Sequence, residues 1–447
     1  MHPRLLTFVE SVRSSYWFVP TIMAVLALFL GAGVIYLDAA IGSDWLDGLS
    51  WYQSNKPDGA QQVLSTIAGS AITVAGVVFS ITIVSVSFAA SQYGPRVLTN
   101  FMGDRGNQIT LGTFIATFLY CLIVLRTIRA GEEGGFVPDL AIIVALLLAL
   151  CSIGVLIFFI HHVPRSIHVN TVVAGIGRQL IISLHDRFPA FIGKAADSDE
   201  ILASATPASL RNPGLRPSEQ VAPVEAKATG YIDAIDDHRL LAIASRANLV
   251  LRLDYQPGDY IHAGRSFALA WPKEQLSDEI LSQLQDTFSI SSRRTPLQDT
   301  RFLIDELVEV GTRALSPGVN DPFTAISCLD WLGAALSEVA CRQLPSRYRA
   351  DEHDILRVVA PTQSFQDYVD RALGNFRQYL ATDKLACLHT LRTIERVAAC
   401  ATGTQVRSVV AEVDALSLAA REALEPSLAA TVQDQAERTR KRLEALA

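Results

Sequence analysis

Charged residues are scarce in this chain: only 19% of its 447 residues are Asp, Glu, Lys or Arg, whereas 50% are hydrophobic. Soluble domains carry roughly 25% charged residues, so the deficit indicates long uncharged runs of the kind found in membranes. The 38 basic residues are outnumbered by 45 acidic ones, and the net charge of −7 argues against a nucleic-acid-binding protein. Gly, Pro and Cys follow no repeat, which excludes collagen-like and disulfide-scaffold proteins.

Recognisable catalytic and metal-binding motifs are also missing. The six cysteines form no CxxC pair, and the chain has no Gly-x-Ser-x-Gly elbow, Walker loop, His-Glu-x-x-His motif or Rossmann glycine pattern. His161, His162 and His168 follow an apolar run, but no acidic residue adjoins them and Pro164 interrupts their shared face. We therefore predict interfacial or neutral histidines, no metal, no cofactor and no assignable catalytic residue.

Long uncharged runs dominate the N-terminal part of the chain. A membrane-spanning helix needs about 20 apolar residues, and four runs meet that length. The fold class that we expect is therefore a membrane α-helical protein with four transmembrane helices. These lie in a transmembrane domain over residues 1–165, at about 16–37, 63–93, 106–127 and 138–161.

Basic residues that flank these runs predict their orientation, because cytoplasmic loops carry an excess of Lys and Arg. The bias favours a multi-pass membrane protein with both termini in the cytoplasm. The cytoplasmic flanks hold Arg4, Arg13, Arg96, Arg105, Arg165 and Arg178, against Lys56, Arg126 and Arg129 on the outside. The first outer loop is expected to be acidic because it contains Asp38, Asp44, Asp47 and Asp58. Its negative charge favours cations as the permeant species.

The second apolar run carries a regular stripe of hydroxyl side chains. Offsets of three, four and seven residues place the members on one helix face. Lipid contact favours Leu, Ile and Phe, so this face predicts either close packing between helices or a water-facing pore lining. The stripe consists of Thr66, Ser70, Thr73, Ser80 and Ser87.

The same run is longer than a bilayer requires. Residues 59–95 are free of charge and would span about 55 Å as one helix, against a hydrocarbon core of about 30 Å. Either the helix projects into the cytoplasm or it breaks. Gly94-Pro95 is the expected break, because a residue before proline leaves the helical region.

The remainder predicts a cytoplasmic α+β region. Residues 166–228 suggest a helix and an Ala/Pro/Ser-rich linker, residues 229–272 a small β unit, and residues 273–447 a helical domain or bundle. Pro257-Gly-Asp-Tyr-Ile-His-Ala-Gly264 resembles the hairpins of biotinyl/lipoyl-like barrels, which implies a β-barrel-like or barrel-sandwich unit. Because no lysine lies between Lys227 and Lys273, a covalent prosthetic arm is disfavoured and a structural module is expected.

A dense polar segment in the helical region predicts a helix, a tight turn and a second, capped helix. Asp321 suits an N-cap and Pro322 the first helical position. An alternative is an anion or metal site at the second helix's start, although the negative charge of Asp321 opposes an anion. The signature turn consists of Arg313, Ser316, Pro317, Gly318, Asn320, Asp321, Pro322 and Thr324.

Several phrases together resemble a family of bacterial predicted membrane proteins whose shared domain has no assigned function. The resemblance covers nearly the whole chain, and Ala314–Pro322 is its most specific part. It implies an integral membrane protein with a cytoplasmic C-terminal half, and it carries over no catalytic residue. The phrases are Ser91-Gln-Tyr-Gly-Pro-Arg-Val-Leu98, Phe101, Gln108-Ile-Thr-Leu-Gly-Thr-Phe-Ile115, His161-His162 and Arg313-Ala-Leu-Ser-Pro-Gly-Val-Asn-Asp-Pro-Phe-Thr-Ala325.

These observations predict an oligomeric inner-membrane channel or channel-like protein. Its second span would line or surround the axis, and its cytoplasmic half would assemble or gate it. The expected partners are membrane lipid, further copies of the chain and ions, and no nucleic acid. The alternatives are a non-conducting membrane-anchored assembly or regulatory protein, and a membrane enzyme that acts at the signature turn.

Overall fold

The chain folds as two compact units, one within Glu10–Thr171 and one within Val172–Ala447, called here the apolar unit and the C-terminal unit. The structure, a computed structural model, describes residues 15–41, 57–94, 104–129, 136–187, 194–195, 207, 210 and 219–445. Some sequence predictions fall outside these residues, namely those on Arg4, Arg13, Asp44, Asp47, Lys56, Arg96 and most of the linker.

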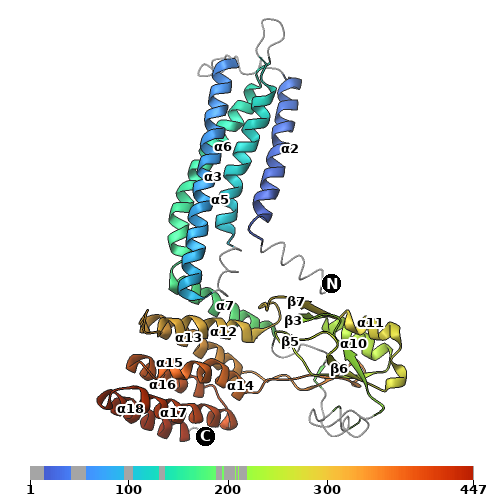
Figure 1. The fold of residues 1–447 in the computed structure, drawn as a ribbon, viewed down its shortest axis with the longest axis vertical. Coiled ribbons are helices and arrows are strands. Elements are labelled where there is room, and N and C mark those ends of the chain that lie inside the picture. Colours follow the sequence, from blue (N-terminus) through green and yellow to red (C-terminus); the bar gives the residue numbers. More distant parts are fainter. Residues whose placement is uncertain are drawn as a thin grey trace. The chain divides into compact units, whose positions relative to one another are not determined.

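Four long helices run side by side in the apolar unit (Figure 1). They are α2 (Phe18–Ile41), α3 (Pro57–Tyr93), α5 (Arg105–Thr127) and α6 (Asp139–Ser166). Helix α5 packs against the other three. The largest side chains buried between the helices include Leu64 of α3, Tyr120 of α5 and Ile142 of α6.

Five described helices are long and apolar enough to cross a membrane, judged by length and composition alone: α2, α3, α5, α6 and α13 (Pro322–Ala340). The first four overlap the apolar ranges expected from the sequence. Helix α13 is an additional candidate, and it belongs to the C-terminal unit. It packs there against α12 (Thr300–Ala314) and α16 (Lys384–Ala398), and 56% of its apolar window is buried.

Helix α3 is unbroken over 37 residues, which corresponds to about 55 Å. It ends at Tyr93, so the expected break at Gly94-Pro95 is the end of the helix. Gly94 has a φ of 110°, a conformation that glycine adopts without a steric penalty.

Two local expectations in the apolar unit are wrong. Asp38 is not a loop residue: it lies in α2, is buried, and its carboxylate accepts a hydrogen bond from the backbone N–H of Ala141 at 3.1 Å. The first N–H groups of a helix lack partners within it, so Asp38 caps α6 from the neighbouring helix. Pro164 does not interrupt α6: it lies in the last turn, and the helix continues to Ser166.

The strands of the C-terminal unit form two sheets. One has six strands in the order β1-β8-β9-β4-β6-β2, and the other has three in the order β5-β3-β7. Strands β4 and β9 are parallel, with Leu251 opposite Val358, and the remaining pairs are antiparallel. The strands are β1 (Lys194–Ala195), β2 (Ala222–Glu225), β3 (Gly230–Ile235), β4 (Val250–Leu253), β5 (Tyr260–Ile261), β6 (Ser266–Trp271), β7 (Phe288–Ser291), β8 (Tyr348–Ala350) and β9 (Leu356–Val359).

The expectation that residues 229–272 contain the β unit and that only helices follow is wrong. Strands β7, β8 and β9 come from the later part of the chain, and β2 comes from the expected linker. These strands have three or four residues, and all of β9 is buried, so it shows no alternation of polar and apolar residues. Its pairing with β4 joins residues about a hundred positions apart, which periodicity does not reveal.

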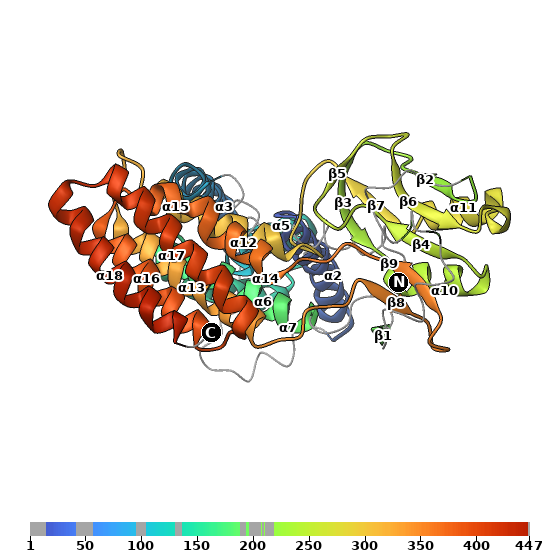
Figure 2. The ribbon, with the colours of Figure 1, turned by 90° about the horizontal axis from the view of Figure 1, so that it is seen from below.

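Helices make up the rest of the C-terminal unit, and Figure 2 shows α15 to α18 at one side of it and the strands at the other. Close glycine contacts fix the packing: a Cβ on Gly177 would lie 2.1 Å from Trp331, and one on Gly311 would lie 2.3 Å from Phe376. The remaining helices are α7 (Val169–Arg187), α10 (Asp237–Arg246), η2 (Lys273–Gln275), α11 (Asp278–Gln285), α14 (Phe365–Val369), the π-helical turn η3 (Asp370–Gly374), α15 (Asn375–Leu380), α17 (Gly403–Ala423) and α18 (Pro426–Glu444).

Candidate functional site

The hydroxyl stripe lies on the face of α3 that the chain itself leaves uncovered. Its five members, Thr66, Ser70, Thr73, Ser80 and Ser87, are all exposed in the single chain. The opposite face of α3 packs inward through Ala60, Leu64, Ala68, Ala71, Ala75 and Val78. Residues two positions apart on a helix are turned by about 200°, so the buried alanines direct the stripe away from the other helices.

Most of the stripe hydroxyls already have a partner within α3. Thr66, Thr73 and Ser80 donate to the carbonyl oxygens four residues earlier, at 2.7, 2.7 and 2.9 Å. Such bonds remove the cost of an unpaired O–H in an apolar medium but leave the oxygen able to accept another bond.

Glycines make the same side of α3 flat. A Cβ added to Gly69 or Gly76 would meet no atom within 4 Å, so both positions face open space. Valines complete the row, and the side chains of Val77 and Val84 are 52% and 68% exposed. This face can therefore admit a second helix at short distance or carry hydroxyls beside water, as a mixed surface of small, polar and β-branched residues.

Three polar side chains inside the apolar unit form hydrogen bonds between its helices. The hydroxyls of Thr117 and Ser152 join α5 to α6 at 3.0 Å, and the Tyr120 hydroxyl donates to the carbonyl of Ala141 at 3.0 Å. These contacts are interhelical packing bonds of the kind expected between membrane helices. The stripe differs from them because its hydroxyls face outward.

His162 has an acidic partner that the local sequence does not show. Its Nε2 lies 3.0 Å from the carboxylate of Asp104, the residue that also caps α5 through the N–H of Asn107. No acidic residue adjoins His162 in the sequence, and the fold supplies one from 58 positions away. Among the described residues no group of three or more His, Cys, Asp or Glu could hold a metal ion.

The signature turn connects α12 to α13, and its polar groups serve the turn. The Asp321 carboxylate accepts from the backbone N–H groups of Phe323 and Thr324 and from the Thr324 hydroxyl, which confirms the predicted N-cap with Pro322 in the first helical position. Ser316 donates to the Arg313 carbonyl at 2.7 Å, and Asn320 adopts a φ of 48°. Pro317 and Gly318 are exposed. The geometry of the turn is that of a helix stop and start.

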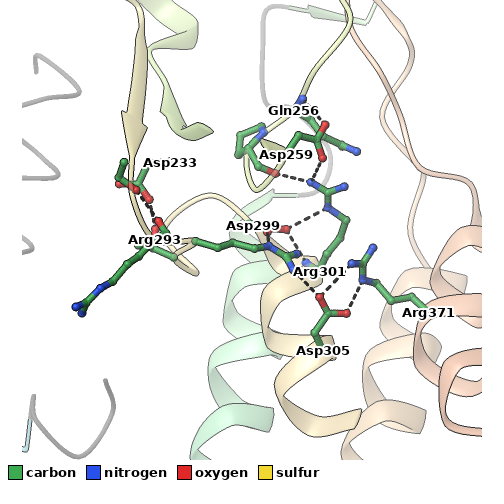
Figure 3. Close-up of polar contacts among 12 residues, drawn as sticks. Asp233, Gln256, Asp259, Arg293, Asp299, Arg301, Asp305 and Arg371 are labelled. Carbon is green, nitrogen blue, oxygen red and sulfur yellow. Dashed lines mark hydrogen bonds and ion pairs between the residues drawn. The ribbon is translucent and has the colours of Figure 1, made fainter. Parts of the chain in front are cut away.

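An ion-pair network lies beside the start of α12 (Figure 3). Asp299 caps the helix and accepts from Arg294 at 2.6 Å and Arg301 at 3.2 Å. Asp305 accepts from Arg294 at 2.6 Å and from Arg371 of η3 at 2.7 Å. Burial alone would raise the pKa of the Asp305 carboxyl, but its two arginine partners lower it below the ordinary value.

Spacing along α12 does not decide the partner of Arg301. Opposite charges four residues apart share a helix face, yet Arg301 does not pair with Asp305. It pairs instead with Asp299 and with Asp259, which directly precedes β5, at 2.9 Å. Glu309 and Arg313, which are also four residues apart, do pair, at 3.5 Å. Tertiary partners therefore displace the local pair where the sheets meet α12, and the network fixes the two parts of the C-terminal unit against each other.

Comparison with known proteins identifies relatives over most of the chain. The family model described as "Predicted membrane protein (DUF2254)" matches residues 13–396. Uncharacterized proteins of Mycobacterium bovis and Mycobacterium tuberculosis are each 29% identical over 398 residues, which is 87% of this chain and 73% of each relative. No solved structure matches the chain.

Proposed function

Because this chain belongs to the predicted membrane protein family DUF2254, we propose that it is a homo-oligomeric channel or channel-like protein of the bacterial inner membrane. In this proposal α3 lines or surrounds the axis between the subunits. The C-terminal unit lies in the cytoplasm and assembles or gates the oligomer. The permeant species are ions.

The observation that carries the proposal is the outward position of the whole hydroxyl stripe. All five hydroxyl residues are exposed on the single chain, and the glycines beside them face open space. Lipid contact does not favour a surface of small and hydroxyl-bearing residues. Contact with a second helix or with water in a pore does favour it. The occupant that fits best is the same face of further copies, because closed symmetric assemblies bring identical surfaces around one axis.

The proposal assigns four membrane spans, α2, α3, α5 and α6. Helix α13 is assigned to the soluble bundle, because it packs against α12 and α16 and buries ten of its residues. The basic flank residues Arg105, Arg165 and Arg178 support a cytoplasmic position for both termini. The expected outer loop loses Asp38, which lies in α2, and Asp58, which lies in the first turn of α3, so the preference for cations rests on Asp44 and Asp47.

We expect cysteines in the stripe to join two copies of the chain. With the exposed native cysteines Cys151, Cys341 and Cys400 replaced by alanine, Thr73→Cys or Ser80→Cys should form covalent dimers with a short bismaleimide in native membranes. The matched control is Ala75→Cys, a buried position on the opposite face of the same helix. Dimers are read on denaturing gels.

The crosslinking pattern decides whether the stripe is an intersubunit surface. Dimers from the stripe cysteines and none from Ala75→Cys support it. Equal crosslinking from both faces, or none from the stripe at any reagent concentration, contradicts it.

A second candidate is a non-conducting membrane-anchored assembly or regulatory protein. The hydroxyl bonds of Thr66, Thr73 and Ser80 to carbonyls of their own helix favour it, because hydroxyls that are satisfied in this way also suit a dry helix interface. Both candidates predict crosslinking through the stripe. They differ in whether the oligomer passes ions.

A further inference from the structure

Arg349 is a buried arginine without a hydrogen-bond partner at two of its nitrogens. It lies in β8, its residue surface is 3% exposed, and its Nε and Nη1 atoms contact no acceptor among the described residues. Burial lowers the pKa of its guanidinium. A buried charged group left unpaired is costly, so this one calls for a partner that the described part of the chain does not supply.

The other buried arginines of the same sheet are paired. Arg252 of β4 bonds Asp254 at 2.7 Å, and Arg357 of β9 bonds Asp351 at 2.8 Å. Arg349 has no such carboxylate partner in the described residues. The residue opposite it in the neighbouring strand is Val358, which is apolar. The missing partner is therefore specific to this position and not a property of the sheet.

Arg349 borders a cavity of about 150 Å³ between the larger sheet and the start of α12 and α14. Most of the wall's surface is apolar, although about half of the residues that line it are polar or charged. The wall residues that matter here are Leu253, Tyr255, Pro345, Ala360, Tyr368 and Arg301. A cavity with a largely apolar surface and a few convergent polar groups is the usual form of a small-molecule site.

Of the two arginines in the cavity wall, only Arg301 is paired with carboxylates among the described residues. Asp299, in the wall, is engaged by Arg294 and Arg301, and Arg301 also bonds Asp259. Asp237 also lies in the wall; burial, as the largest effect, raises the pKa of its carboxyl, and its Oδ1 accepts from the backbone N–H of His238. Neither carboxylate forms an ion pair with Arg349 in the described part of the chain.

We propose that this cavity binds a small organic monoanion, a carboxylate with a compact apolar body, whose charge is met by Arg349. A guanidinium matches a carboxylate through two parallel N–H···O bonds. One unpaired positive charge balances one negative charge, and the neighbouring Asp237 and Asp299 disfavour a dianion such as a phosphate ester. A cavity of this size in another protein holds benzene, so benzoate is a probe of suitable dimensions. The inference is independent of the proposed channel function.

Binding is measured by equilibrium dialysis of benzoate, benzamide and inorganic phosphate against the full-length protein in lipid nanodiscs. We expect saturable benzoate binding, with benzamide at least tenfold weaker because it lacks the charge and phosphate weaker than benzoate. Arg349→Met should weaken benzoate at least tenfold, since a charge-assisted bond is lost. Arg265→Met removes an equal charge from an exposed turn and should leave binding unchanged.

Two further measurements separate a ligand-binding arginine from a structural one. The melting temperature of ligand-free Arg349→Met should equal or exceed that of the parent, because a buried unpaired charge is removed. Ala360→Leu, which fills the cavity without touching the charge, should also abolish benzoate binding.

The proposal is overturned by any of four results. These are no saturable benzoate binding to the parent, phosphate binding tighter than benzoate, benzoate binding that is unchanged in Arg349→Met, or a melting temperature that falls by several degrees in that variant.

Discussion

Replacement of Thr73, Ser80 and Ser87 together by leucine is expected to abolish ion flux through the reconstituted protein. Each leucine removes a hydroxyl from the exposed face of α3 and adds bulk on the side where two copies are proposed to meet. A narrow, wetted passage closes under such a change, because leucine repels water and fills space. The measurement is potassium and chloride flux from proteoliposomes that contain the full-length protein.

The control for this triple variant changes the same number of neighbouring side chains. Ile72, Ile81 and Ile83 are exposed on α3 but outside the stripe, and their replacement by leucine should leave the flux unchanged. Both variants must retain the oligomer mass of the parent. Unchanged flux in a correctly assembled stripe variant contradicts a lining role for α3, and a parent that forms the oligomer but passes no ions favours the non-conducting alternative.

Asp351→Asn is expected to destabilise the C-terminal unit by about 3–5 kcal/mol, the typical cost of breaking a buried ion pair. The Asp351 side chain is 7% exposed and accepts from Arg357 at 2.8 Å and from the Ser245 hydroxyl at 2.7 Å. It also accepts from the backbone N–H groups of His353 and Ile355. Asparagine keeps the size but leaves the Arg357 charge buried without a counter-charge.

Denaturant titration of the full-length protein in detergent measures this loss, with tryptophan fluorescence as the signal because Trp271 lies in β6 of the same sheet. The control is Asp354→Asn, three residues away in the exposed turn between β8 and β9. Asp354 has a φ of 57°, which asparagine tolerates, so its replacement should change stability by less than about 0.5 kcal/mol. Equal stabilities of the two variants would show that the buried pair does not hold the hairpin.

The ion pair of Asp351 also predicts that the stability of the C-terminal unit depends on pH. Burial alone would raise the pKa of its carboxyl, but the hydrogen bonds from Arg357, Ser245 and two backbone N–H groups lower it well below the ordinary value of 3.8. The folded state thus binds this proton less readily than the unfolded state. The contribution of Asp351 to the free energy of unfolding is fully present above the pKa of the unfolded state. It is lost as pH falls through the lower pKa of the folded state. The difference in free energy of unfolding between the parent and Asp351→Asn should therefore decrease below about pH 4.

Local sequence patterns predicted the helices better than the contacts between distant elements. The uncharged runs and the proline after Gly94 were sufficient to predict α3 and its end, because hydropathy and backbone sterics act over a few residues. Asp38 was misplaced because its role, the capping of α6, depends on a helix about a hundred residues away. The parallel pairing of β9 with β4 was missed for the same reason.

The candidate sites show the same division. The seven-residue spacing of the hydroxyls predicted one common face of α3, but only the fold shows that this face is opposite the buried alanines. The cap at Asp321 was predictable from Asp-Pro at a helix start. Arg349 was not, because an arginine in a short strand carries no sign of whether a carboxylate will meet it.

The most direct test of the proposed α3 passage is the reactivity of single cysteines along this helix toward a membrane-impermeant, charged thiol reagent. The protein is in lipid bilayers, and Cys151, Cys341 and Cys400 are replaced by alanine. Cysteines at Thr66, Ser70, Thr73, Ser80 and Ser87 are predicted to react, in a pattern that repeats with the helix, whereas cysteines at Ile72, Ile81 and Ile83 are predicted to stay protected. If the stripe positions are as protected as the isoleucine positions, the stripe faces lipid or a dry interface, and the proposed passage along α3 is wrong.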